Sequence, residues 1–192
     1  MGEPATSIRV EAAAPDRWGD VERLAGDRGF TSGCWCMWWR VTSREFSDRH
    51  GPGLREDLKT LVRRGDEPGL VAYAGDEPVG WVALAPRSAY PRLNRSPKLK
   101  QVDDEPVWSI SCFYIDRRHR RRGVARELVQ AAVGYARAHG ARVVEAYPID
   151  TSTRTSAASA ELYTGTLPMF EQAGFREVAR RGGRPIVRLA LQ

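Results

Sequence analysis

The sequence predicts an α/β fold, and three patterns point to it. Residues 108–115 form an apolar, aromatic-rich run of strand length, and residues 124–140 carry apolar side chains at helical spacing. A second apolar run, residues 141–147, follows that helix. Earlier, residues 70–84 contain two apolar runs around the turn residues 75–78, which predicts a hairpin. If the strands on either side of the helix are parallel, they form a right-handed crossover unit.

The length and composition of the chain are typical of one soluble domain. Its 192 residues, 42% hydrophobic and 28% charged, are enough for a sizeable core, and no linker divides them. We therefore predict a single domain over residues 1–192. No apolar run approaches the roughly 18 residues that a membrane-spanning helix needs, and the first residues carry no signal-peptide pattern. We expect no membrane association.

The cysteine pattern predicts free thiols. Cys34 and Cys36 are too close for an easy mutual bridge, and the total of three is odd, so we expect reduced thiols and a cytoplasmic protein. Together with His50 these two cysteines offer three metal ligands. That spacing fits no established zinc pattern, and a zinc site needs about four ligands, so we expect no metal.

The turn between the central strand and the helix is strongly basic. Residues 117–122 contain five arginines and His119. A helix start presents unpaired backbone N–H groups and a partial positive charge, and Gly123 allows a ligand to approach the main chain closely. Taken alone, such a run is more often a solvated face or a nucleic-acid patch. The strand before it and the helix after it favour a site for a pyrophosphate.

The residues Arg120-Arg-Arg-Gly123-Val-Ala125 resemble the pattern Gln/Arg-x-x-Gly-x-Gly/Ala of the GNAT superfamily of CoA-dependent N-acyltransferases. Residues 170–175, Phe-Glu-Gln-Ala-Gly-Phe, are similar to the closing Tyr-x-x-x-Gly-Phe signature of that family. The resemblance covers roughly residues 70–190, and the first 65 residues poorly. It implies a mixed, mostly antiparallel sheet with helices on both faces. Its two central parallel strands would splay apart around CoA.

The resemblance also implies where acetyl-CoA binds as a co-substrate. The main chain of Phe113, Tyr114 and Ile115 would lie against the pantetheine arm and the acetyl carbonyl. Backbone N–H groups and guanidinium groups of the next segment would meet the pyrophosphate. The residues of that segment are Arg120, Arg121, Arg122, Gly123, Val124, Ala125 and Arg126. The implied reaction is direct attack by a primary amine on the thioester, with both substrates bound together.

Three residues are candidates for the chemistry. Phe170 stands where many GNAT proteins carry the tyrosine that protonates CoA, and it has no proton to donate, so Tyr163 becomes the candidate acid. The alternative is a tyrosine that packs beside the cofactor. Glu145 is the candidate base, and its alternative is a carboxylate paired with an arginine. Cys112 offers a route through an acetyl-enzyme, although a free cysteine is often only a small buried hydrophobe.

The segment 29–39 is unusually aromatic. The resemblance implies that this part of the chain lies beside the acceptor pocket, so we expect Trp35 and Trp38 to contribute to its wall. The alternative is that these tryptophans fill the core. The long, proline-rich segment 86–106 and the segment 148–160 are further candidates to cover a substrate.

The net charge of +6 favours anionic partners, and CoA is one of them. The basic residues are almost all arginine, which is typical of a GC-rich bacterial genome. We favour CoA over nucleic acid, since proteins that bind single strands usually interleave aromatic residues with the basic ones, and residues 117–122 contain only His119 besides arginine. We expect a small-molecule or peptide amine as acceptor, and the sequence leaves room for a homodimer. The alternatives are a GNAT-fold protein that binds CoA without turnover, and an RNA- or aminoacyl-tRNA-binding protein that uses the arginine cluster.

Overall fold

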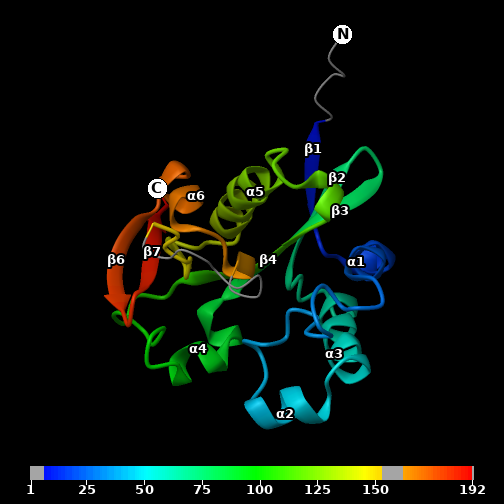
Figure 1. Cartoon of the computed structure of the whole chain (residues 1–192), viewed down its shortest axis with the longest axis horizontal. Helices are drawn as coiled ribbons and strands as arrows, with labels where there is room; N and C mark the ends of the chain where they lie inside the picture. Colours follow the sequence, from blue (N-terminus) through cyan, green and yellow to red (C-terminus); the bar gives the residue numbers. More distant parts are fainter. Residues whose placement is uncertain (1–6, 153–161, 192) are drawn as a thin grey trace.

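A computed structural model of the chain describes residues 7–152 and 162–191. Within this part of the chain, seven strands form one sheet in the order β1-β2-β3-β4-β5-β7-β6 (Figure 1). Neighbouring strands are antiparallel except for β4 and β5, which run parallel. The prediction of a mixed, mostly antiparallel sheet is therefore confirmed. The strands are β1 (Ile8–Ala12), β2 (Gly69–Ala74), β3 (Glu77–Pro86), β4 (Trp108–Ile115), β5 (Val143–Ala146), β6 (Arg176–Arg181) and β7 (Arg184–Ala190).

Helices cover both faces of the sheet, as predicted (Figure 1). The α-helices of the described residues are α1 (Trp18–Ala25), α2 (Ser43–Asp48), α3 (Pro52–Arg63), α4 (Pro91–Arg95), α5 (Val124–Ala138) and α6 (Leu167–Gln172), with 3-10 turns η1 (Pro15–Arg17), η2 (Arg87–Ala89), η3 (Arg117–His119) and η4 (Leu162–Thr164). Helices α5 and α6 share a core with the face of the sheet that carries Val82 and Ile110. Helices α1 and α3 pack on the opposite face, which carries Val71 and Trp81.

Helix α5 lies directly on the sheet because its apolar residues fall on one side. Its buried residues are Val124, Leu128, Val129, Ala132 and Ala136, which repeat at helical spacing. Gly80 of β3 lies beneath the first turn of the helix. A Cβ at that position would come within 2.8 Å of Cγ1 of Val124 and 3.1 Å of Cδ1 of Leu128. The helix therefore approaches the backbone of β3 more closely than a side chain at position 80 would allow.

The parallel strands β4 and β5 separate after a short paired stretch. Only Trp108, Ser109 and Ile110 pair with β5, which ends at Ala146. Strand β4 continues to Ile115, and on its other side it stays paired with β3 up to that residue. Among the described residues, its second half therefore has no strand partner on the β5 side. Turn η4 lies against β4 in this region.

The segment 86–106 forms η2, α4 and a return that packs back onto the sheet. Tyr90, Leu93 and Leu99 form a third apolar cluster with Tyr147 and Ile186. Of the segment 148–160, residues 153–160 lie outside the described residues. Among the helices of the described residues, none combines enough length and apolarity for a bilayer span.

Candidate active site

The turn between β4 and α5 folds as a compact basic cap on the start of the helix. Asp116 ends the strand, and its carboxylate accepts hydrogen bonds from the backbone N–H of Arg118 at 2.8 Å and from Nε of Arg118 at 3.1 Å. These bonds and the guanidinium charge hold the pKa of Asp116 below its usual range. Arg121 and Gly123 have positive φ angles of 62° and 82°, so the chain reverses there and helix α5 begins at Val124. Nothing lies within 4 Å of a Cβ built at Gly123, so the backbone angle, and not crowding, favours glycine.

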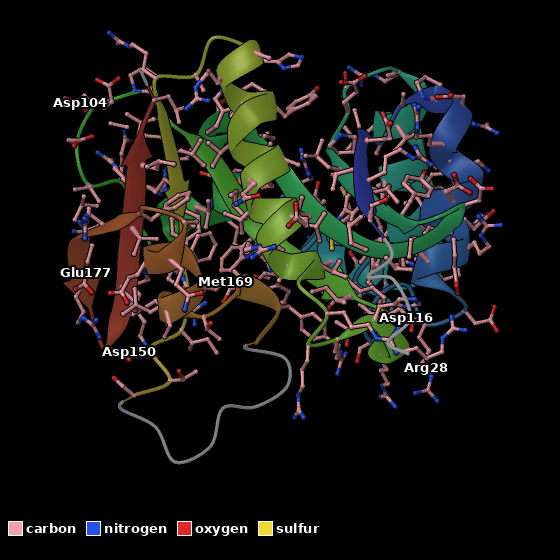
Figure 2. All side chains as sticks on the ribbon, turned by 90° about the horizontal axis from the view of Figure 1, so that it is seen from above. Arg28, Asp104, Asp116, Asp150, Met169 and Glu177 are labelled. Carbon is pink, nitrogen blue, oxygen red and sulfur yellow. The ribbon has the colours of Figure 1, made fainter. Side chains whose placement is uncertain are left out.

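The arginines of this turn divide into two groups. Arg118 is bound to Asp116 and Glu77, and Arg126 to Glu127. Among the described residues, four arginines have no carboxylate partner: Arg117, Arg120, Arg121 and Arg122. All four are exposed and stand beside the first N–H groups of α5, which have no partner within the helix. Figure 2 shows Arg28 and Asp116 at this same end of α5.

Two cavities meet beside the unpaired half of β4. The larger cavity, of about 560 Å³, lies between the segment 31–50, the return of the 86–106 loop, β4 and the turns near the C-terminus. The smaller cavity, of about 470 Å³, is lined by Arg28, Arg117 and Arg120 among others. Thr31, Ser32 and Tyr163 line both. A basic compartment and a more apolar one are therefore joined at three shared residues.

Of the residues expected along β4, Tyr114 lines one of the two cavities, whereas Phe113 and Ile115 line neither. Phe113 is buried against Phe170, with ring centres 6.0 Å apart. Tyr114 faces the other side of the sheet, where it packs on Phe30 at 5.4 Å and lines the smaller cavity. Since β5 has diverged here, alternate main-chain groups of this stretch point to the gap between the strands.

The two candidate tryptophans lie in different environments. Trp38 is 45% exposed and lines the larger cavity, where the guanidinium of Arg92 lies 3.9 Å from its ring centre. Trp35 is 5% exposed and packs on Trp18 and Phe30, so its position matches the core alternative. It does not line either of the two cavities, and we withdraw it as a candidate for contact with a substrate.

Tyr163 belongs to η4, which precedes α6. Helix α6 begins after Thr166, between Gly165 and Pro168, so Tyr163 and Phe170 do not share a helix. Phe170 is fully buried and packs on Phe113 and Phe175. Tyr163 lies where the two cavities join, which keeps it as the candidate acid.

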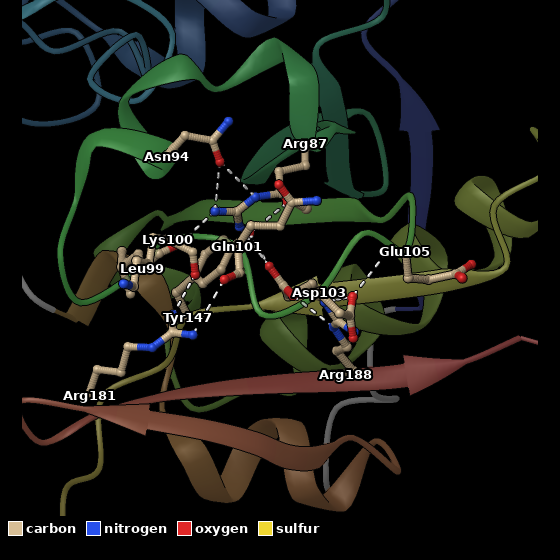
Figure 3. A network of polar contacts seen from close by, with 12 residues as sticks. Arg87, Asn94, Leu99, Lys100, Gln101, Asp103, Glu105, Tyr147, Arg181 and Arg188 are labelled. Carbon is tan, nitrogen blue, oxygen red and sulfur yellow. Dashed lines mark hydrogen bonds and ion pairs between the residues drawn. The ribbon is translucent and has the colours of Figure 1, made fainter.

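Glu145 belongs to a buried polar network with Arg87, Tyr147 and Arg188, and it does not line either of the two cavities. Figure 3 shows how these three partners converge from separate segments. Its side chain is 1% exposed. One carboxylate oxygen accepts hydrogen bonds from Arg87 and from the hydroxyl of Tyr147, both at 2.7 Å, and the other accepts one from Arg188 at 2.8 Å. Burial raises the pKa of Tyr147 well above its usual value, so this phenol stays a hydrogen-bond donor. The arrangement matches the paired-carboxylate alternative, and we withdraw Glu145 as the base.

The larger cavity brings together residues that the sequence separates widely. Cys34, Cys36, Cys112 and His50 all line it, and the thiol of Cys36 donates to the sulfur of Cys112 at 3.4 Å. Hydrogen bonding with Cys36 lowers the pKa of the Cys34 thiol to about 7, while hydrogen bonds to Cys112 and Cys34 and burial raise that of Cys36. In the described part of the chain, no group of three or more His, Cys, Asp or Glu side chains is placed to hold a metal ion.

Several residues of the larger cavity were not predicted. They are Trp39, Phe46, Lys98 and Arg184, with Gly182 beside them. Phe46 and Trp39 are aromatic residues near Trp38 in the sequence, and Lys98 lies in the segment 86–106 that we expect to cover a substrate. Arg184, at the start of β7, carries no local signal, because contacts between distant segments bring it to the cavity.

The site combines three features: parallel strands that separate, a basic turn at a helix start, and two joined cavities. Together they suit the transfer of an acyl group from a CoA thioester. The model of the Acetyltransferase (GNAT) family matches residues 35–165, and the chain therefore belongs to the GNAT family of acetyltransferases. It is an acyltransferase, and its residues at the basic turn fit the phosphates of an acyl-CoA.

Solved structures share this fold at low sequence identity. The acetyltransferase GNAT family protein from Listeria monocytogenes has a TM-score of 0.59 and 10% identity, covering 96% of this chain and 95% of that one. The PaiA N-acetyltransferase from Thermoplasma acidophilum, in complex with coenzyme A, has a TM-score of 0.55 and 12% identity, covering 96% and 99%. The mosquito protein named arylalkylamine N-acetyltransferase like 5b has a TM-score of 0.57 and 12% identity, covering 96% of this chain and 100% of that one. No curated protein sequence matches the chain.

Proposed function

We propose that this protein transfers an acetyl group from acetyl-CoA to a primary amine, with both substrates bound at once, and that residues 1–192 work as one domain. The observation that carries the proposal is the meeting of a basic and an apolar cavity at Tyr163, beside the unpaired half of β4. The smaller cavity suits the phosphate end of a CoA thioester, and the larger one suits an acceptor. The three free cysteines support a reducing, cytoplasmic setting.

The phosphates would be held at the start of α5. The four arginines without a carboxylate partner supply charge there, and the amides of Gly123, Val124, Ala125 and Arg126 supply donors. Main-chain groups of Phe113, Tyr114 and Ile115 would hold the pantetheine arm and the acetyl carbonyl at the open side of β4. Acetyl-CoA supplies the thioester that the amine attacks, forming a C–N bond as the C–S bond breaks.

Proton transfer limits such a reaction more than the leaving group does. An alkyl ammonium of pKa about 10.4 must lose a proton at a cost of about 4–5 kcal/mol at neutral pH, whereas a thiol of pKa about 8.5 leaves readily. Placing both substrates together supplies roughly 7–11 kcal/mol, so modest acid and base catalysis is enough. We assign proton removal to His50, directly or through water, because His50 lines the larger cavity. Tyr163 then protonates the departing thiolate.

The lining of the larger cavity suits an acceptor with an aromatic or apolar body and an anionic group. Trp38, Trp39 and Phe46 form an aromatic wall, and Lys98 and Arg184 bring positive charge. Among the described residues that line the cavity, none is acidic. Lys98 would repel an acceptor with several positive charges, whereas it would offer a partner to a carboxylate.

The test is an amine panel with purified protein and acetyl-CoA, read by the mass of the acetylated amine and by release of free CoA. Tryptophan, tryptophan amide and tryptamine share an indole, and only tryptophan carries a carboxylate; spermidine is an aliphatic polycation without an aromatic ring. We expect acetylated product, with tryptophan best and spermidine worst. CoA binding without product from any amine would support the alternative of a non-catalytic binding protein, which Phe170 at the tyrosine position favours. Absence of CoA binding by folded protein would overturn the proposal.

A further inference from the structure

Three thiols meet at the larger cavity, and the proposed acetyl transfer uses none of them. Cys34 and Cys36 belong to the segment 29–39 after α1, which we call the turn segment, and Cys112 belongs to β4. Cys36 is the middle member, since it interacts with Cys34 and donates to the sulfur of Cys112 at 3.4 Å. The two segments lie 76 residues apart in sequence, so only the fold brings the sulfurs together.

The three thiols differ in reactivity. The pKa of about 7 for Cys34 leaves a large fraction of its thiol ionised at neutral pH, and the thiolate is the nucleophile. Cys34 is only partly buried and lines the cavity, so a small oxidant in the cavity can reach it. Cys36 is buried and holds its proton more tightly. The partly buried thiol of lowered pKa thus stands beside two sulfurs that are already in contact.

We propose that these cysteines form a peroxide-reactive site in which Cys34 is oxidised first and a disulfide between Cys36 and Cys112 is the end product. The Cys34 thiolate attacks one oxygen of hydrogen peroxide, the O–O bond breaks, and Cys34 sulfenic acid and water result. The thiol of Cys36 attacks that sulfur and water leaves, which gives a Cys34–Cys36 disulfide. The sulfur of Cys112 then attacks the sulfur of Cys36, so the Cys36–Cys112 bond forms as the Cys34–Cys36 bond breaks, and the proton of Cys112 passes to the departing Cys34 sulfur.

The last step has a chemical reason. A thiol of low pKa is the better leaving group, so exchange at Cys36 expels Cys34. A bridge between two cysteines separated by one residue is also strained, whereas Cys36 and Cys112 are already adjacent. In sum, two thiols and one peroxide give one disulfide and two waters, and Cys34 is regenerated.

The product would tie the turn segment to β4 at the cavity. The sulfur separation would shorten from 3.4 Å to about 2.05 Å, which moves Cys36 and its neighbours toward β4. Because both sulfurs line the larger cavity, oxidised and reduced protein would differ in acceptor binding. This last consequence rests on the proposed function, but the disulfide itself does not.

The experiment exposes the reduced full-length protein to hydrogen peroxide and maps the product without reduction. Trypsin places Cys34 and Cys36 on peptide 29–40 and Cys112 on peptide 101–117. We expect these peptides linked, with fragmentation on either side of Trp35 assigning the link to Cys36, and free thiols falling from three to one. Three thiols that stay free, or oxidise singly to sulfinic acid, would overturn the proposal.

Serine variants separate the steps, with circular dichroism and thermal melting confirming that each folds. Cys34→Ser should slow formation of the linked peptides by about tenfold or more and leave the end product the same. Cys36→Ser should abolish the link, and Cys112→Ser should stop the reaction at a bridge within peptide 29–40. If Cys34→Ser formed the linked peptides at the native rate, the proposal that Cys34 is oxidised first would be wrong. These readouts are peptide masses, so they hold even if no amine is acetylated.

Discussion

Arg87 connects Glu145 to the wall of the larger cavity. Its guanidinium donates to a carboxylate oxygen of Glu145 at 2.7 Å and to the backbone carbonyl of Leu99 at 2.6 Å. Leu99 and its neighbour Lys98 line the cavity. We therefore propose that Glu145 is a positioning residue for the loop that carries Lys98.

Glu145→Gln should destabilise the protein and weaken acceptor binding without removing the base. The change leaves the buried guanidinium of Arg87 without a carboxylate partner, which costs on the order of 3–5 kcal/mol. We expect a lower melting temperature and a raised KM for the amine, with the pH profile of kcat unchanged. Asp103→Asn, at the exposed end of the network, should have a much smaller effect on both.

The role of Glu145 can be contradicted directly. Loss of turnover in Glu145→Gln with native stability and native KM would restore it as the base. His50→Gln provides the comparison, because we expect that variant to lower kcat and alter its pH profile while leaving the melting temperature close to native.

Tyr163→Phe should lower kcat by about tenfold or more and leave CoA affinity nearly native, because it removes only the proton donor at the junction of the cavities. Turnover and CoA binding are measured separately, by product mass and by calorimetry. Tyr135→Phe is the matched control, since its hydroxyl bonds to Glu67 at the far end of α5. Full turnover by Tyr163→Phe would exclude it as the acid.

Trp38→Ala should affect acceptor binding, whereas Trp35→Ala should affect stability. Trp38 is half exposed at the cavity, so its loss should raise the KM for the amine with little change in stability. Trp35 is buried among aromatic rings, and its truncation should cost about 3–5 kcal/mol in the free energy of unfolding. Denaturant unfolding and steady-state kinetics on both variants give the comparison. Unchanged amine KM in Trp38→Ala would count against the cavity as the acceptor site.

Arg120→Ala should weaken CoA binding by about tenfold to a hundredfold, since it removes one charge-assisted contact worth about 1.5–3 kcal/mol. Arg118→Ala should weaken it much less, because Arg118 is held by Asp116 and Glu77. Raising the salt concentration should weaken native binding and narrow the gap between native protein and Arg120→Ala. If both substitutions changed the CoA dissociation constant equally, the distinction between arginines with and without a carboxylate partner would be wrong.

Alkylation of Cys34 should speed up as pH rises through about 7. Its pKa is lowered from 9.0 to about 7, and only the thiolate reacts, so the rate climbs through that pH and levels off above it. The measurement is iodoacetamide labelling of peptide 29–40 across pH 5–9. Cys36→Ser should move the midpoint upward, because hydrogen bonding with Cys36 is the main cause of the lowered pKa. A midpoint near 9 in the native protein would contradict the assignment.

The sequence was enough to predict the elements around the basic turn. Helix α5 and strand β4 have strong, simple periodicities, and Gly123 with the arginines marks the reversal between them. The segment 29–39, which carries Trp35 and Cys36, has no regular spacing of apolar residues. Trp35 and Cys36 adopt positive φ angles, so alternation along the chain does not tell which side chains turn inward. Trp35 and Trp38 are therefore alike in sequence and opposite in burial.

Glu145 and the cysteines were hard to predict for a different reason. Which groups surround Glu145 depends on how the 86–106 loop returns to the sheet, and which sulfurs meet depends on how the turn segment lies on β4. Both are contacts between segments far apart in the chain. Local patterns carry no information about them.

The close approach at Gly80 has a consequence for the cofactor site. Val124 and Leu128 rest on that glycine, and the same first turn of α5 presents the amides and arginines of the basic turn. A methyl group at position 80 would lift this end of the helix off the strand. The proposed phosphate site therefore depends on the hydrogen atom that occupies the place of a side chain at position 80.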